Sequence, residues 1–250
     1  MDAEVMQTNG LNIKEWNATI YRVFPVRWFK EMVRTKTMGL LRPSRWKDPF
    51  ENFYLKCKVR LGTGEIASLK PISSKWYGQC WTKNRDSDAM WRIYSREEDG
   101  VRVSTTIRRL FSAIYDDKDQ FATLKYFVGE VEYKERAEIE DFLRRTPFMS
   151  LAFGGQAGPF ARTLCIKRPE FSHEAEVRLL VQHLEPTDPG DVLNVPFDYA
   201  KVLDDEVALD PRLEPAQFEA VKKELLGAGC TLKITQSDLY KIDEMTIDLE

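Results

Sequence analysis

Short apolar segments alternate with polar residues along most of this chain, and they predict a succession of strands and helices. The first clear pair begins with residues 18–24, which have strand character and end at Pro25, a residue suited to the first turn of a helix. Apolar residues at helical spacing follow over 26–33, and Gly39 is expected to cap that helix. Arg22 should therefore lie near the carboxyl end of the first strand.

The remaining pattern predicts an α+β fold. We expect strands over 77–82, 101–106, 124–133, 192–195, 200–209 and 230–234, and helices over 88–96, 107–115, 135–145 and 214–226. The dipeptides Gly154-Gly155 and Gly158-Pro159 within 148–162 predict a mobile loop or a bend between two helical pieces. Strands and helices follow one another in a mixed order, which favours α+β over a doubly wound sheet.

One strand is introduced by an unusual run of charge. Residues 173–178 read His-Glu-Ala-Glu-Val-Arg and lead directly into the apolar run 179–181. On a strand, Glu174, Glu176 and Arg178 would point the same way at ~6.6 Å intervals. Two carboxylates and a guanidinium on one patch suit a site that stabilises positive charge, with carboxyl pKa values pushed apart by partial burial. The solvated face of an antiparallel strand would produce the same pattern.

Composition bounds the class of protein. A chain of 250 residues with 43% hydrophobic and 31% charged residues can bury one sizeable core, so we expect a single domain over 1–250, with its core at about 18–240 and a short flexible N-terminus. No apolar run approaches the ~20 residues of a membrane span, and the first nine residues lack the profile of a secretory signal. These features predict a cytoplasmic protein.

Cysteine and histidine usage excludes several chemistries. The four cysteines, Cys57, Cys80, Cys165 and Cys230, are far apart and form no CxxC pair. There are only two histidines, His173 and His183, which stand ten residues apart. Neither a zinc site nor a disulfide framework is supported, and a histidine-based catalytic triad is poorly served. We therefore expect no metal, and chemistry based on carboxylate, arginine, hydroxyl and aromatic groups.

Basic residues gather in one zone of a chain whose net charge is −3. The stretch from position 22 to position 47 contains only one acidic residue, Glu31. It contains eight basic residues: Arg22, Arg27, Lys30, Arg34, Lys36, Arg42, Arg45 and Lys47. A local basic zone on an acidic protein favours a specific polyanion, such as a dinucleotide pyrophosphate or a nucleic-acid strand. A solvated helix face followed by a loop would have the same composition.

Two further segments carry groups that could bind a ligand. Arg42 and Ser44 enter a loop shaped by prolines, and together with Arg22 they would form a natural phosphate cradle, although a plain connection would look the same. Residues 104–106, Ser-Thr-Thr, lie where a strand feeds into a helix, and helix capping or oxygen recognition would explain them equally. The helix 88–96 places Trp91 and Tyr94 on one side, as core residues or as a ligand platform.

Several spaced motifs together resemble one bacterial family. They are Leu41-Arg-Pro-Ser-Arg-Trp-Lys-Asp-Pro-Phe-Glu51, Cys80-Trp-Thr82, Met90-Trp-Arg-Ile-Tyr94 with Gly100-Val101 behind it, and Glu174-Ala-Glu-Val-Arg178. This set resembles the family catalogued as domain of unknown function 2971, over roughly residues 20 to 240. The family name implies no activity.

A looser resemblance does imply an activity. Tyr21-Arg22 on the first strand, the hydroxyl run that starts at Ser104 and the late Glu174-Ala-Glu176 follow the order of motifs in arginine-type (R-S-E) ADP-ribosyltransferases. The resemblance implies a mixed, mainly antiparallel split β-sheet with flanking helices. Its third hydroxyl is Thr106 instead of serine, so Ser104 and Ser44 both stay open for the serine role.

This second resemblance also implies roles for the residues that carry it. NAD would be the co-substrate, with Glu176 stabilising positive charge on the ribose and Glu174 contacting or deprotonating the acceptor. Arg22, with Arg42, would hold the pyrophosphate. The nicotinamide would stack on an aromatic side chain, for which the candidates are Tyr21, Trp91 and Tyr94.

The function expected on this basis is NAD-dependent mono-ADP-ribosyl transfer to a macromolecule. The resemblance to ADP-ribosyltransferases, together with the size of the chain, implies a bacterial toxin or phage-defence effector with an antitoxin partner. The basic zone favours RNA or DNA over protein as the acceptor. Two alternatives stay open. One is a metal-independent nucleic-acid-processing protein that uses Glu51 with Glu174, and the other is a non-catalytic module whose acidic row docks a basic partner.

Overall fold

The computed structural model describes residues 2–46, 58–60, 64–68, 74–145 and 158–242. Its strands are β1 Gly10–Leu11, β2 Thr19–Pro25, β3 Thr37–Leu41, β4 Lys58–Arg60, β5 Ile66–Ser68, β6 Trp76–Thr82, β7 Gly100–Thr106, β8 Tyr126–Glu130, β9 Glu132–Tyr133, β10 Ile166–Lys167, β11 Glu176–Gln182, β12 Val192–Pro196, β13 Glu206–Leu209 and β14 Lys233–Gln236. The motif residues 48–51, including Glu51, and the predicted loop residues 148–157 lie outside these ranges.

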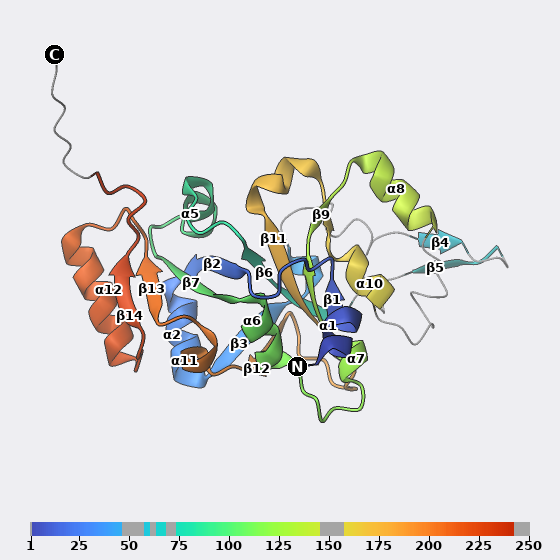
Figure 1. Ribbon diagram of the computed structural model, residues 1–250, viewed down its shortest axis with the longest axis horizontal. Helices are drawn as coiled ribbons and strands as arrows, with labels where there is room; N and C mark the ends of the chain where they lie inside the picture. The colour runs from blue at the N-terminus through green and yellow to red at the C-terminus, as the bar shows by residue number, and fades with distance from the viewer. Residues whose placement is uncertain (1, 47–57, 61–63, 69–73, 146–157, 243–250) are drawn as a thin grey trace, which may run out of the picture.

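Helices connect the strands (Figure 1). They are α1 Ala3–Asn9, α2 Val26–Thr35, α5 Asp88–Tyr94, α6 Ile107–Ile114, α7 Ala122–Lys125, α8 Arg136–Arg145, α10 Gly158–Thr163, α11 Tyr199–Val202 and α12 Pro215–Gly227, with the 3-10 helices η1 Pro43–Arg45 and η2 Pro169–Glu174. The structure thus has the predicted α+β character, and no regular βα alternation.

The main sheet runs in the order β1-β8-β11-β6-β2-β7-β13-β14. Its central pairs, β11 with β8 and β6, β2 with β6 and β7, and β7 with β13, are all antiparallel, while the edge pairs β1–β8 and β13–β14 are parallel. The prediction of a mixed, mainly antiparallel sheet is therefore confirmed.

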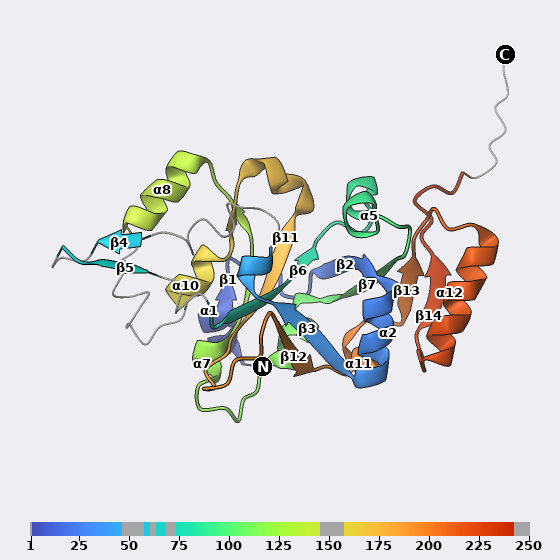
Figure 2. The same cartoon turned by 180° about the vertical axis from the view of Figure 1, so that it is seen from behind.

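The sheet splits beside β6. One edge of β6 pairs with β2 only at Tyr21–Thr82 and with β3 only at Leu41–Gly78. Strands β2 and β3 are joined by α2, which packs on both (Figure 2). The connection forces the two strands apart along the same edge of β6, and β3 then pairs with β12. The resulting fork, between β2, β3 and β6, confirms the predicted split.

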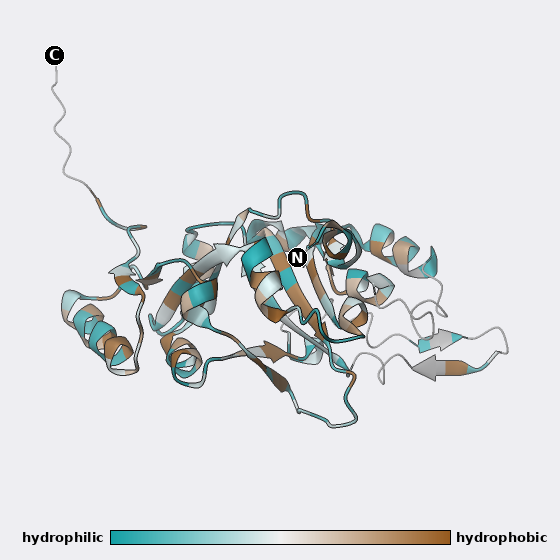
Figure 3. Cartoon of the chain, turned by 60° about the horizontal axis from the view of Figure 1, so that its bottom comes forward, coloured by the Kyte–Doolittle hydropathy of each residue, from teal (hydrophilic) through white to brown (hydrophobic). Residues whose placement is uncertain are grey.

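Alternation along the strands creates two apolar layers. The main core cluster contains Ile20 and Phe24 of β2, Val177 and Leu179 of β11, and the inner faces of α2 and α6. A second cluster, which includes Leu180 of β11, packs against α10 on the opposite face of the sheet. In Figure 3 the apolar residues are concentrated on the strands and on the helix sides turned toward them.

Several local expectations are wrong. Residues 200–202, the start of the strand predicted over 200–209, belong to the helix α11, and β13 begins only at Glu206. Gly39 does not cap α2, because Lys36 adopts the left-handed conformation (φ 51°) and ends the helix, leaving Gly39 inside β3. The helix predicted over 88–96 stops at Tyr94 as α5, and Gly100 opens β7. The core also begins earlier than residue 18, since Leu11 of β1 is buried in the second cluster.

The charged run before β11 is only partly a strand. His173 and Glu174 belong to η2, and Ala175 has the left-handed conformation with φ 42° and ψ 55°. The strand begins at Glu176, so Glu176 and Arg178 share a face as predicted, but Glu174 does not belong to that row. Glu174 has the sequence spacing of a strand residue, but the turn at Ala175 separates it from β11. Sequence periodicity alone does not reveal that turn.

Candidate active site

One row of side chains crosses four adjacent strands. Glu176 of β11 is paired with Thr82 of β6, Thr82 with Tyr21 of β2, and Tyr21 with Ser104 of β7. Residues directly opposite one another on antiparallel strands project from the same face. At about 4.8 Å per strand, the row spans roughly 14 Å from Glu176 to Ser104. The three motifs that stood far apart in the sequence therefore share one line across the sheet.

Glu176 is a buried carboxylate held by Arg178. The Arg178 Nε and Nη2 atoms donate to Glu176 Oε1 and Oε2 at 2.8 and 2.9 Å, a two-point ion pair in which the side chains are 0% and 3% exposed. Burial by itself would raise the pKa of Glu176, but Arg178, with contributions from Lys167 and Cys80, lowers that pKa to about 2. Glu176 is therefore ionised throughout the physiological range.

Glu174 reaches the same cluster from η2. Its Oε2 atom lies 2.6 Å from Lys167 Nζ, which is also 3.4 Å from Glu176 Oε2. We call Glu174, Glu176, Lys167 and Arg178 the acidic cluster, after the two carboxylates at its centre. All four residues are buried, and each carboxylate has a cation within 4 Å, so the cluster is electrostatically balanced in a poorly solvated place.

The turn between the two glutamates is clamped by β6 and the residues after it. Thr82 Oγ1 donates to the Glu174 carbonyl at 2.5 Å, and the Lys83 amide donates to the Ala175 carbonyl at 2.9 Å. The Asn84 side chain donates to the His173 carbonyl at 2.7 Å. Three consecutive residues thus hold three consecutive carbonyls, which stabilises the left-handed Ala175 and orients both carboxylates.

Arg22 lies at the fork of the sheet. It follows Tyr21, the last point at which β2 pairs with β6, and its guanidinium carbon lies 4.6 Å from the Phe24 ring. Among the described residues Arg22 has no hydrogen-bond or ion-pair partner. Burial lowers its pKa to about 10, an effect that Cys80 and Tyr94 partly offset. An unpaired, poorly solvated cation is unfavourable unless a ligand supplies the opposite charge.

Of the aromatic candidates, Trp91 is a core residue and Tyr94 is not. Trp91 is fully buried and donates from Nε1 to Asp86 Oδ1 at 3.1 Å, so it has no free face for a nicotinamide ring. Tyr94 is 36% exposed, and its pKa is raised by burial and by the charges of Glu174, Cys80 and Glu176. The end of α5 therefore brings the Tyr94 hydroxyl close to the acidic cluster.

A buried network fixes the end of α5. Ser95 Oγ donates to Asp210 Oδ2 at 2.5 Å and accepts from the Gly100 amide at 2.7 Å. Arg212 pairs with the same Asp210 carboxylate and donates to the Ser95 carbonyl at 2.6 Å. Because Ser95 follows Tyr94 directly, these bonds position Tyr94 relative to β7 and the row of Tyr21 and Ser104.

Arg42 and Ser44 lie away from this row. The Arg42 guanidinium donates to the Tyr77 hydroxyl at 2.9 and 3.0 Å and forms an ion pair with Asp188. Tyr77 is opposite Val181 and therefore faces the side of the sheet away from Glu176. Ser44 is exposed in η1. Arg42 is thus bound by groups of the same chain, and neither Arg42 nor Ser44 lies on the row of Glu176, Thr82, Tyr21 and Ser104. The three-residue phosphate cradle with Arg22 stays a prediction.

The hydroxyl run 104–106 divides into three environments. Thr106 caps α6 by accepting from the Arg109 amide, and the buried Thr105 donates to the Val202 carbonyl at 2.5 Å. Ser104 is half-buried on the row with Tyr21, whose ring lies 5.9 Å from the Arg102 guanidinium. Of the two candidates for the serine role, the structure therefore places Ser104, and not Ser44, on the line that includes Glu176.

Three cations of the basic zone are paired with distant acidic residues. Lys30 pairs with Glu224, Arg42 with Asp188, and Arg45 with Asp191. Arg27, Arg34 and Lys36 are exposed on or beside α2 and form no ion pair among the described residues. The zone is therefore less positive in three dimensions than its composition predicts.

Sequence reasoning missed four residues of this region: Cys80, Thr82, Tyr133 and Lys167. The Cys80-Trp-Thr82 motif had been noted without a role, whereas Tyr133, which accepts from the Glu176 amide at 2.9 Å, had no signal of its own. Burial raises the pKa of Tyr133 to about 12. Lys167 comes from a two-residue strand, too short for periodicity to detect.

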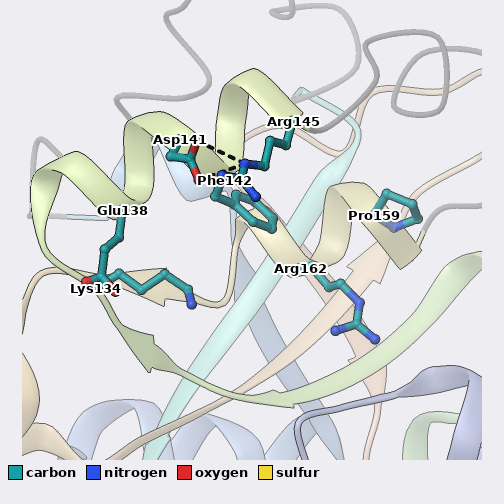
Figure 4. Close-up of a pocket in the computed structure, with 7 residues that line it drawn as sticks. All are labelled: Lys134, Glu138, Asp141, Phe142, Arg145, Pro159 and Arg162. Atoms are coloured by element: carbon teal, nitrogen blue, oxygen red, sulfur yellow. Dashed lines mark hydrogen bonds and ion pairs between the residues drawn. The ribbon is translucent and has the colours of Figure 1, made fainter.

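A pocket of about 500 Å³ opens between α8 and α10 (Figure 4). It is lined by Lys134, Glu138, Asp141, Phe142, Arg145, Pro159 and Arg162. None of the predicted site residues lines it, so the candidate active site rests on the row and the acidic cluster.

Within the described ranges, no group of three or more His, Cys, Asp and Glu side chains is arranged to hold a metal ion. The helices described here include none with the length and apolarity needed to cross a membrane.

Comparisons with known proteins confirm the first resemblance. The model of a family described as "Protein of unknown function (DUF2971)" matches residues 90–179, a range that includes Tyr94, Ser104, Glu174 and Glu176 but not Arg22. No curated protein matches the chain.

Solved structures similar to this one include complexes of Thermus sp. 2.9 DarT. The complex with carba-NAD+ aligns at 14% identity and a TM-score of 0.39, covering 89% of this chain and 97% of that one. The complex with ADP-ribosylated ssDNA aligns at 12% identity and 0.40, covering 92% and 97%. The complex with NAD+ aligns at 14% identity and 0.40, covering 90% and 98%.

Proposed function

We propose that this protein is an NAD-dependent mono-ADP-ribosyltransferase. The observation that carries the proposal is the single row of Glu176, Thr82, Tyr21 and Ser104 across four strands, with Arg22 next to Tyr21 in β2 at the fork of the sheet. The row joins the three motifs whose order resembles that of arginine-type ADP-ribosyltransferases, although nothing in their sequence spacing requires them to meet.

The two ends of the row suit the two ends of the nicotinamide nucleotide. The pyrophosphate would bind Arg22, whose positive charge lacks an internal partner among the described residues. The nicotinamide ribose would lie toward Glu176, with Tyr94 and the half-buried Tyr21 available to contact the nicotinamide ring. Ser104 would supply a hydroxyl at the β7 end. Trp91 and Arg42, which are engaged in the protein interior or elsewhere on the surface, are not part of this proposal.

The acidic cluster supplies the electrostatics of bond cleavage. Breaking the bond between nicotinamide and ribose builds positive charge on the sugar, which a fixed carboxylate stabilises. Glu176 is ionised and is held by Arg178, and a carboxylate oxygen that accepts one hydrogen bond can accept another from a ribose hydroxyl. Glu174 would contact the acceptor and take its proton.

We further propose a cytoplasmic toxin or defence effector that modifies a nucleic acid in preference to protein. The support is the group of exposed cations on or beside α2, Arg27, Arg34 and Lys36. If RNA or DNA binds there, its affinity should fall steeply with salt, and a flat salt response would contradict this part of the proposal. Toxicity on expression that a co-expressed antitoxin relieves would support the biological role.

The two alternatives receive less support. A module that docks a basic partner needs carboxylates whose charge is not already compensated, whereas Glu174 and Glu176 form ion pairs with Lys167 and Arg178. A nucleic-acid-processing site that joins Glu51 to Glu174 includes a residue outside the described ranges. It would cleave nucleic acid without NAD, which distinguishes it from the transferase.

The test combines NAD binding with release of nicotinamide. Calorimetric titration with NAD+ and transfer from labelled NAD+ would be measured on the wild type, on Arg22→Met and on the exposed control Arg136→Met. We expect loss of NAD binding only in Arg22→Met. A second pair, Glu176→Gln and its exposed control Glu185→Gln, tests chemistry, with a loss of about 100- to 1000-fold in rate for Glu176→Gln. Unchanged turnover in folded Arg22→Met and Glu176→Gln would refute the proposal.

A further inference from the structure

Lys167 is a buried cation placed between the two carboxylates. Its Nζ atom lies 2.6 Å from Glu174 Oε2 and 3.4 Å from Glu176 Oε2, with its side chain only 6% exposed. The ammonium group also lies 4.5 Å from the centre of the Phe171 ring. Its backbone is tied to β9 by pairing with Tyr133. Lys167 is therefore anchored at both ends, with its ammonium group against the Glu174 carboxylate.

Among the described residues, the charges of the acidic cluster already balance. Glu174 and Glu176 contribute two negative charges, and Lys167 and Arg178 contribute two positive ones. A guanidinium acceptor that approached Glu174 would bring a further positive charge next to the Lys167 ammonium. Like charges in a poorly solvated site repel strongly, whereas an uncharged nucleophile meets no such repulsion.

We propose that Lys167 determines the acceptor chemistry, by occupying Glu174 as an internal cation and thereby restricting transfer to neutral oxygen or nitrogen nucleophiles. This inference rests on the proposed transferase function. In the transfer step the bond between ribose C1′ and the nicotinamide nitrogen breaks, and its electron pair leaves with neutral nicotinamide. A lone pair of the acceptor forms the new bond to C1′, and the acceptor's proton passes to Glu174 and then to solvent. With water as acceptor, the products are ADP-ribose, nicotinamide and a proton.

The experiment compares a charged acceptor with a neutral one. Nicotinamide release in water and formation of ADP-ribosyl-agmatine, where agmatine is a small guanidinium acceptor, would be measured on the wild type, Lys167→Met and Lys167→Arg. The wild type should release nicotinamide without modifying agmatine. Lys167→Met removes the charge at similar length and should raise agmatine modification about tenfold or more. Lys167→Arg keeps the charge and should exclude agmatine like the wild type.

The outcomes separate this inference from the function on which it rests. Agmatine modification by the wild type would overturn the inference and support the transferase. Equal exclusion of agmatine by the wild type and by folded Lys167→Met would also overturn it. If Lys167→Met does not fold, Lys167→Gln, which retains a hydrogen-bond donor, takes its place. No release of nicotinamide by the wild type with any acceptor would overturn the transferase and this inference together.

Discussion

At the β11 end of the row, both carboxylates of the acidic cluster have cations of the same chain within 4 Å, whereas at the β2 end Arg22 has no such partner among the described residues. Both ends are poorly solvated, and in both the pKa of a charged group is shifted. Both pKa values are lowered, but for opposite reasons. The pKa of Glu176 is lowered because its charged form is stabilised, and the pKa of Arg22 is lowered because its charged form is not.

This difference distinguishes positioning from binding. A charge with an internal partner is held in place and contributes to stability, so Arg178 and Lys167 orient the two glutamates. A buried charge without an internal partner lowers the stability of the fold. Such a charge is useful only when a ligand of opposite sign completes the ion pair. The unpaired cation at the fork, more than the acidic cluster, therefore marks where an anionic ligand would bind.

The largest effect is expected at the paired end. Arg178→Met removes the two-point partner of the buried Glu176 carboxylate, and should lower the free energy of unfolding by about 3–5 kcal/mol because an uncompensated charge stays buried. Urea denaturation would measure it. The control is Arg136→Met, which breaks only an exposed pair with Glu140 and should cost less than about 0.5 kcal/mol. Equal effects of the two changes would break the comparison.

Acid should remove the contribution of Glu176 to stability. Its pKa is about 2 in the folded protein against an ordinary value of 4.5, so the stabilisation is fully present above pH 4.5 and is lost as the pH falls toward 2. The shift corresponds to about 3 kcal/mol. Denaturation of the wild type and of Glu176→Gln between pH 6 and pH 2 would test this. The variant should lack this part of the pH dependence, and parallel profiles would contradict the assignment.

At the unpaired end the sign of the effect reverses. Arg22→Met replaces a poorly solvated cation by an apolar chain, and should raise the free energy of unfolding by on the order of 2 kcal/mol while NAD binding is lost. Thermal melting and calorimetry would be combined. Arg34→Met, on the exposed face of α2, should change stability by less than about 0.5 kcal/mol. A destabilised Arg22→Met would show that Arg22 has a structural partner, and the contrast between the two ends would disappear.

The smallest effect concerns the turn that joins the two glutamates. Ala175 adopts a left-handed conformation that glycine reaches without strain, so Ala175→Gly should raise stability by about 0.5–1 kcal/mol. The matched control Ala220→Gly lies within α12 and should lower stability by a similar amount. Urea denaturation of both variants would measure the pair. Destabilisation in both would mean that the clamp of Thr82, Lys83 and Asn84 leaves no strain at Ala175.

The sequence predicted a large part of the fold. The strand–helix unit of β2 and α2, the strand β7 leading into α6, and α8 and α12 all follow from periodicity and breaker residues. Errors fell where a short element or an unusual backbone conformation interrupted a pattern, as at Lys36 and Ala175. The left-handed conformation of these non-glycine residues depends on surrounding hydrogen bonds that their own identity does not reveal.

For the site, the sequence by itself determined which groups were available and which of them share a strand face. The spacing of Glu176 and Arg178 was sufficient to place them together, because side-chain alternation on a strand is local. Only the tertiary structure decided that Lys167 neutralises Glu174, that Arg42 turns to Tyr77 and Asp188, and that Arg22 has no ion-pair partner in the described part of the chain. Pairing of charges depends on distance in space, and strand register across the split sheet sets those distances between segments far apart in the chain.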